Sequence, residues 1–210
     1  MTAVVLGHIP FALIGILVFG FPDSNALSYI LASALLHFFY QIFLLNAYKF
    51  GELSEIYPIA RGLSPLIIIS ISFSFFEENV SFYEFVGILL ISLSLIIYGL
   101  KQFLNNDTNI KGFSLALITG CFIASYSIVD GYGARITQNP IGFYSSMTLI
   151  NGLIFYFFAK WKDREIIKKI FFSGKLSFFV GGASSYAACL LYTSDAADDS
   201  LRVDLGGRRI

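Results

Sequence analysis

Six stretches of about 20 mostly apolar residues dominate this 210-residue sequence, and they restrict its possible folds more than any other feature. A helix needs roughly 20 apolar residues to cross a bilayer core of about 30 Å. Backbone groups in lipid must be satisfied internally, so stretches of this length predict helices and exclude a barrel. The sequence therefore predicts an all-α membrane protein, a multi-span transmembrane helix bundle. The predicted spans are residues 2–20, 28–50, 53–76, 82–100, 112–135 and 141–160.

The composition agrees with a chain surrounded by lipid. Hydrophobic residues make up 56% and charged residues 13%, with a mean hydropathy of +0.73, whereas soluble domains carry about 25% charged residues. A net charge of zero gives no indication of a nucleic-acid partner. Two cysteines, Cys121 and Cys189, supply neither a disulfide framework nor a metal site. No nucleotide loop or nucleophile–base pair is visible, so we expect no cofactor, no metal and no enzymatic activity.

A seventh span begins near Ser177 but changes character at Cys189. Residues 177–188 would reach about 18 Å at 1.5 Å per residue, which is too short to cross. Residues 189–210 carry four acidic and three basic side chains and no membrane pattern. They resemble a transposase-type sequencing adapter translated in one frame, so we expect an artefactual tail. A genuine acidic tail is the alternative, and the nucleotide sequence beyond codon 189 distinguishes the two.

The basic residues fall almost entirely on one side of the predicted membrane. Nine lie in or next to loops after even-numbered spans, against Arg135 alone on the other side. Because cytoplasmic loops carry the excess of Lys and Arg, we expect loops 49–52, 101–111 and 160–176 to be cytoplasmic, in a multi-pass protein of the inner (plasma) membrane. The basic segment 160–175 could alternatively form an amphipathic helix for a partner. The nine residues are Lys49, Lys101, Lys111, Lys160, Lys162, Arg164, Lys168, Lys169 and Lys175.

Arg61 is the first candidate for a substrate-binding residue. It lies eight residues after Leu53, about 12 Å into its span at 1.5 Å per residue, where a guanidinium exposed to lipid costs several kcal/mol. Tyr57 precedes it by four residues, on the same helical face, and could stack on the cation or hydrogen-bond a ligand. Alternatively, Arg61 extends its side chain to the interface and binds nothing.

Two prolines and a glycine surround Arg61 in the sequence. Pro58 lacks an amide proton and interferes with the preceding turn, and Gly62 and Pro65 follow within one turn. We expect a loosened helix whose free backbone dipoles, with the cation, form a ligand site of the kind found in transporters. In the alternative interpretation, the prolines only bend the helix to fit its neighbours.

His37 and Asp130 are further candidates within predicted spans. His37 lies beside Tyr40 and Gln41 and could bind a proton or ligand, or serve only in packing. Asp130 lies about 27 Å along its span from Gly112, nearer the outer surface than Arg61, and a structural role is favoured for it. The glycines that follow Asp130 could end this helix.

Glu84 is better explained as a helix cap than as a transport carboxylate. The stretch "SFYE" places Ser81 three residues before Glu84. This is the spacing of a capping box, in which each side chain satisfies a free amide of the other residue.

Three stretches together resemble the EamA-like branch of the drug/metabolite transporter superfamily. They are "NAYKFGELSEIYPIARGLSPL" (46–66), "FFEENVSFYEFVGILLISLSLIIYGL" (75–100) and "SYSIVDGYGAR" (125–135). Glu78 and Gly87 stand where the family has its glutamate and glycine before and within the fifth helix. The resemblance covers residues 1–188 and implies a ten-helix fold made of two inverted five-helix repeats.

The register of this resemblance implies an internal fragment of such a transporter. Residues 1–104 would be a partial first repeat, helices two to five, and residues 111–188 a partial second repeat, helices six to eight. The absence of basic residues from "FPDSN" and the six in the 160–175 loop agree with the opposite orientation of two odd-numbered repeats.

The resemblance and the charged residues lead to one functional expectation. We expect a carrier that moves a small-molecule substrate, an anionic one if Arg61 faces it, by alternating access with proton or ion coupling. Transport would require the helices that a fragment lacks. The alternatives are a non-transporting membrane scaffold or subunit and, less favoured because no polar catalytic pair lies at one depth, an intramembrane enzyme. The expected substrate-binding residues are Arg61, Tyr57, Pro58, His37 and Asp130.

Overall fold

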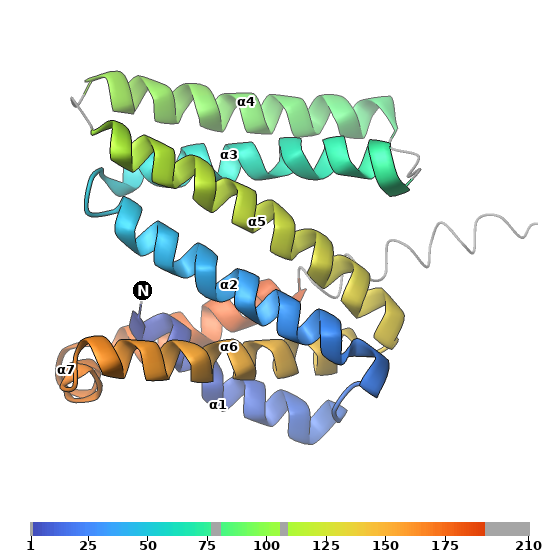
Figure 1. Cartoon of the computed structure of the whole chain (residues 1–210), viewed down its shortest axis with the longest axis vertical. Helices are drawn as coiled ribbons and strands as arrows, with labels where there is room; N and C mark the ends of the chain where they lie inside the picture. The colour runs from blue at the N-terminus through green and yellow to red at the C-terminus, as the bar shows by residue number, and fades with distance from the viewer. Residues whose placement is uncertain (1, 77–80, 106–108, 192–210) are drawn as a thin grey trace, which may run out of the picture. The chain divides into compact units, whose positions relative to one another are not determined.

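The computed structural model describes residues 2–76, 81–105 and 109–191, and the regular structure in these ranges is entirely helical. Six helices are long and apolar enough to cross a membrane, which confirms the prediction of an all-α multi-span protein. The elements in Figure 1 are α1 (Thr2–Phe19), η1 (Ser24–Ala26), α2 (Leu27–Ala47), α3 (Leu53–Ile71), η2 (Ser72–Phe76), α4 (Phe82–Asn105), α5 (Ile110–Thr137), α6 (Pro140–Lys162), α7 (Ile166–Ser173) and η3 (Ser177–Gly181).

The helices form two compact units. Unit 1 comprises Met1–Leu35 and Val129–Ile210, and unit 2 comprises Leu36–Ile128. The helices α2 and α5 therefore contribute residues to both units, while each of the other long helices belongs to one. These units are defined by contacts within the structure. They do not test the predicted division into two repeats, residues 1–104 and 111–188, which stays a prediction.

In unit 2, glycines allow α3 and α4 to pack closely side by side (Figure 1). A Cβ atom added at Gly62 would lie 2.9 Å from the carbonyl oxygen of Ser92 and 2.8 Å from Cγ1 of Ile96. One added at Gly99 would lie 2.7 Å from Cγ1 of Ile59. The two helices are antiparallel, and their close approach uses the small-residue contacts typical of membrane helices.

In unit 1, α1 packs against α6 and against the last described helix. A Cβ atom at Gly182 would lie 2.7 Å from the carbonyl carbon of Gly7, so no side chain fits between these two backbones. A Cβ atom at Gly15 would lie 2.2 Å from Oγ of Ser145 and 2.7 Å from the hydroxyl of Tyr186. Glycines thus set the spacing of helices in this unit as well.

Local sequence signals fix several helix ends. The N–H of Ser81 donates to Oε2 of Glu84 (2.8 Å) and the N–H of Glu84 donates to Oγ of Ser81 (3.3 Å), which confirms the predicted capping box. At the start of α6, the N–H of Gly142 donates to Oδ1 of Asn139 (2.9 Å). Gly20 follows the end of α1 with φ of +80°, a left-handed conformation that glycine adopts without steric cost.

The seventh helix begins at Ser177, as predicted, and runs to Leu191. It starts as the π-helical turn η3 and continues as α-helix. It is shorter than the six long helices. Residues 189–191, which the sequence assigned to the tail, extend this helix, and residues 192–210 of the proposed tail lie outside the described residues.

Prolines and glycines inside two helices do not end them. The helix α3 is continuous from Leu53 to Ile71 with both Pro58 and Pro65 inside it, so the loosening expected around Arg61 does not break the helix. Pro65 cannot donate to the Arg61 carbonyl, and the Ser64 hydroxyl donates to it instead (3.3 Å).

The helix α5 likewise continues past the glycines that follow Asp130. It ends at Thr137 and is followed by Gln138 with φ of +50°. Arg135 is therefore in the last helical turn rather than in a loop. Gly133 has a packing role, because a Cβ atom there would lie 2.5 Å from the Phe143 ring.

Candidate functional site

Arg61 and Tyr57 form the centre of a polar site in unit 2. Both side chains are exposed, and they lie one turn apart on α3. The guanidinium carbon of Arg61 is 5.5 Å from the centre of the Tyr57 ring, within cation–π range. The predicted contact between them is confirmed.

Three aromatic rings from α2 and α5 lie together in the same unit. The His37 ring lies 3.9 Å from the Tyr126 ring, between centres, at an angle of 33°. The Tyr40 ring contacts both, at 5.6 Å from His37 and 5.1 Å from Tyr126. All three side chains are half-buried. His37 is therefore a packed ring in an aromatic group rather than a solitary side chain.

Arg61 connects its helix to this aromatic group through electrostatic interactions. Tyr126 and Tyr40 interact with the guanidinium, along with Tyr57. We call Arg61, Tyr57, His37, Tyr40 and Tyr126 the Arg61 cluster. Among the residues that the structure describes, none of the carboxylates forms an ion pair with Arg61.

Tyr48, just after the end of α2, lies close enough to Tyr57 and Arg61 to interact with both. Burial, followed by the interaction with Tyr57, raises the pKa of Tyr48 to about 12, and the charge of Arg61 only partly opposes the shift. Tyr48 therefore remains a neutral phenol at physiological pH and can act as a hydrogen-bond donor beside the cluster.

No protein-family model, curated protein or solved structure matches the chain. A guanidinium offers a planar fork of donors that suits a carboxylate or phosphate, and phenol hydroxyls can donate to the same anion. The cluster combines both, with one exposed cation and several tyrosines.

The other predicted site residues take different places. Pro58 is buried on α3, so its ring is not exposed with Arg61 and Tyr57. Asp130 belongs to unit 1, where its carboxylate accepts a hydrogen bond from the Ser33 hydroxyl. Both of these side chains are buried, and the bond joins α2 to α5. This agrees with the structural role that the sequence favoured for Asp130.

Sequence reasoning missed Tyr126 as a member of the site. It lies in the stretch 125–135 that carries the family resemblance, but nothing in that stretch marked it as a site residue, and only the pairing of α5 with α2 brings it to His37. The described residues hold no group of three or more His, Cys, Asp or Glu side chains that could bind a metal.

A second polar pair that the sequence did not indicate lies inside unit 1. The Ser145 hydroxyl donates to the carbonyl of Ile141 (2.6 Å), which uses its one proton. The Tyr186 hydroxyl, 2.7 Å away, must then be the donor to Ser145. The pair lies against Gly15 and ties the last helix to α6, so it serves packing.

Proposed function

We propose that this chain belongs to a carrier of the EamA-like type, which moves a small anionic metabolite across the membrane, with the Arg61 cluster as the site for the anionic group. The observation that supports this proposal is the exposed guanidinium of Arg61 on a spanning helix, held by Tyr57 and lacking a carboxylate partner among the described residues.

The energetic argument concerns the charge of Arg61. An Arg at the centre of a spanning helix costs about 2.5–3.5 kcal/mol on insertion scales. The ring of Tyr57 stabilises the cation but does not neutralise it. A bound carboxylate or phosphate would neutralise it, and a charge-assisted hydrogen bond is worth about 1.5–3 kcal/mol. A binding role thus explains both the cation and the surrounding phenols.

Ligand-induced stabilisation tests the binding site. Thermal unfolding of the detergent-solubilised chain would be followed with acetate, succinate, benzoate or inorganic phosphate, each against chloride at equal ionic strength. We expect at least one anion to stabilise the wild type, by about 2.7 kcal/mol at a hundredfold excess over Kd. The same anion should have no effect on Arg61→Gln.

Arg135→Gln is the matched control, since it removes the same charge from the end of α5 and should retain the stabilisation. If no anion distinguishes Arg61→Gln from the wild type, the cluster has only a packing role. Uptake of the stabilising anion into liposomes by the complete ten-helix carrier that the resemblance implies then separates a carrier from a non-transporting scaffold, because only the carrier produces Arg61-dependent flux.

A further inference from the structure

The end of α6 and the segment after it expose large apolar side chains beside basic ones. Trp161, Phe172 and Leu176 are 84%, 87% and 76% exposed. Trp161 is the only tryptophan in the sequence. The segment begins in the last turn of α6, a helix that can span a membrane and that ends at Lys162. We call residues 160–176 the α7 segment.

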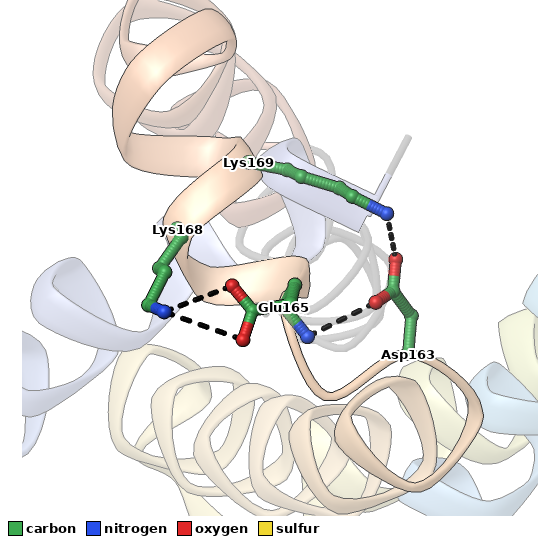
Figure 2. Close-up of polar contacts among 4 residues, drawn as sticks. All are labelled: Asp163, Glu165, Lys168 and Lys169. Atoms are coloured by element: carbon green, nitrogen blue, oxygen red, sulfur yellow. Dashed lines mark hydrogen bonds and ion pairs between the residues drawn. The ribbon is translucent and has the colours of Figure 1, made fainter.

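Ion pairs within the α7 segment match each of its acidic side chains with a lysine. Oδ2 of Asp163 lies 2.5 Å from Nζ of Lys169, and Oε2 of Glu165 lies 3.0 Å from Nζ of Lys168 (Figure 2). The N–H of Glu165 also donates to Oδ1 of Asp163 (3.0 Å). These contacts fix the turn that leads into α7.

The remaining charge of the α7 segment is positive. It contains six basic and two acidic residues, so four positive charges stay unmatched. Two of these are held over aromatic rings at the end of α6, with Lys160 5.7 Å from the Tyr156 ring and Lys162 6.0 Å from the Phe158 ring. The four basic residues beyond the ion pairs are Lys160, Lys162, Arg164 and Lys175.

The helix α7 has two different faces. Ile170 is buried in unit 1. The turn after α7 also lies against α1, because a Cβ atom added at Gly174 would lie 3.6 Å from Cβ of Ala3. Phe172 and the two lysines of the helix are exposed. A short helix anchored on one side, with aromatic and basic side chains elsewhere, has the character of an element lying in the membrane interface.

We infer that the α7 segment lies in the membrane interface and binds the headgroups of anionic lipids. Trp161 and Phe172 would sit at headgroup level, where aromatic side chains are enriched, and the unmatched positive charges would face the lipid phosphates. Each Lys or Arg near an anionic leaflet contributes attraction that falls off within a Debye length. This inference does not depend on Arg61 or on transport.

Fluorescence of Trp161 tests the inference directly, because no other tryptophan contributes. The full chain would be reconstituted in equal mixtures of phosphatidylcholine and phosphatidylglycerol, with bromine on the acyl chains of one lipid or the other. We expect stronger quenching when phosphatidylglycerol is brominated. An enrichment of about fivefold corresponds to about 1 kcal/mol, the contribution of one basic residue.

A pair of double variants assigns the effect to this segment. Arg164→Gln/Lys175→Gln should reduce the enrichment to about twofold or less. Lys101→Gln/Lys111→Gln removes two exposed lysines from α4 and α5 and should leave it unchanged. Equal loss in both double variants would show a general charge effect and overturn the assignment.

Two other results would also contradict the inference. Absence of quenching by either brominated lipid would place Trp161 away from the bilayer, and equal quenching by both would exclude a preference for anionic headgroups. Inorganic phosphate, added against chloride at equal ionic strength, distinguishes a lipid headgroup from a free anion. Loss of the enrichment with phosphate alone would indicate a site for free phosphate instead of lipid.

Discussion

The guanidinium carbon of Arg61 lies 5.5 Å from the centre of the Tyr57 ring, one turn earlier on α3. The electron-rich face of Tyr57 stabilises the cation and restricts the rotamers of a long side chain. Because α3 is continuous through its prolines, the two residues keep the i, i+4 spacing that brings their side chains together. If Arg61 binds an anion as proposed, this contact would lower the entropic cost of binding.

Replacement of Arg61 separates ligand binding from interfacial positioning. If Arg61 binds an anionic group, Arg61→Lys should weaken binding because it loses the planar fork, and Arg61→Gln should weaken it more. Loss of a charged hydrogen bond of about 1.5–3 kcal/mol corresponds to a roughly tenfold to hundredfold change in Kd. The measurement is anion affinity for the three side chains at matched expression.

A different pattern is expected if Arg61 only extends to the interface. Lysine should then substitute freely, because its flexible stem reaches the same depth. Unchanged affinity in Arg61→Gln would remove Arg61 from the site.

Gly62 should tolerate no side chain, because α4 lies against it. In Gly62→Ala the added Cβ would lie 2.9 Å from the Ser92 carbonyl oxygen, and such overpacking costs about 1–3 kcal/mol. Gly87→Ala on α4 is the matched control, since nothing lies within 4 Å of its Cβ position and alanine favours the helix. Thermal unfolding in detergent should show a lower Tm for Gly62→Ala only, and equal Tm values would contradict the close packing.

Asp130 should matter mainly for the stability of unit 1. Asp130→Ala removes the acceptor of the buried Ser33 hydroxyl, at a cost of about 1–3 kcal/mol. Asp130→Asn keeps an acceptor oxygen and should cost less. Thermal unfolding of the two variants checks this order. If Asp130→Asn is as stable as the wild type but has lost flux, Asp130 takes part in transport rather than packing.

The membrane orientation can be tested by cysteine labelling. Cys121 and Cys189, both exposed, would first be replaced by serine. A cysteine at Ser24, between the first two spans, should then react in intact cells with an impermeant thiol reagent, whereas one at Ser173, beside the basic loop, should react only after lysis. Reaction of the Ser173→Cys variant in intact cells would reverse the orientation.

The start of α7 should be sensitive to acid. The hydrogen bond from Lys169, together with the N–H of Glu165, lowers the pKa of Asp163 from its ordinary value. A lowered folded-state pKa stabilises the folded turn above the ordinary pKa, and this contribution is lost as pH falls through the folded-state value. Hydrogen exchange of the Glu165 amide should accelerate in that range, relative to the intrinsic rate.

Asp163→Asn provides the comparison for this pH effect. Its Glu165 amide should exchange at the same relative rate above and below the transition, because the side chain no longer titrates. A wild-type amide without any acid transition would show that Asp163 does not hold the turn.

The spans, the capping of α4 and the contact of Tyr57 with Arg61 could be predicted from the sequence because each depends on residues near one another in the chain. The bilayer requires a minimum apolar length, a capping box requires a spacing of three residues, and a helical turn brings residues i and i+4 together. These requirements are satisfied within one segment, whatever the rest of the chain does.

Only the tertiary structure decided which helical faces meet. Helices that are apolar on all sides carry little periodic signal to mark an inner face, so the contact of Tyr126 with His37 could not be predicted. The role of Gly62 was misjudged for the same reason, since a glycine in a helix looks like a weak point until a neighbouring backbone is seen against it. In a membrane, close approach at small residues and hydrogen bonds such as that of Ser33 with Asp130 select the partner of each helix. These contacts join residues far apart in the sequence.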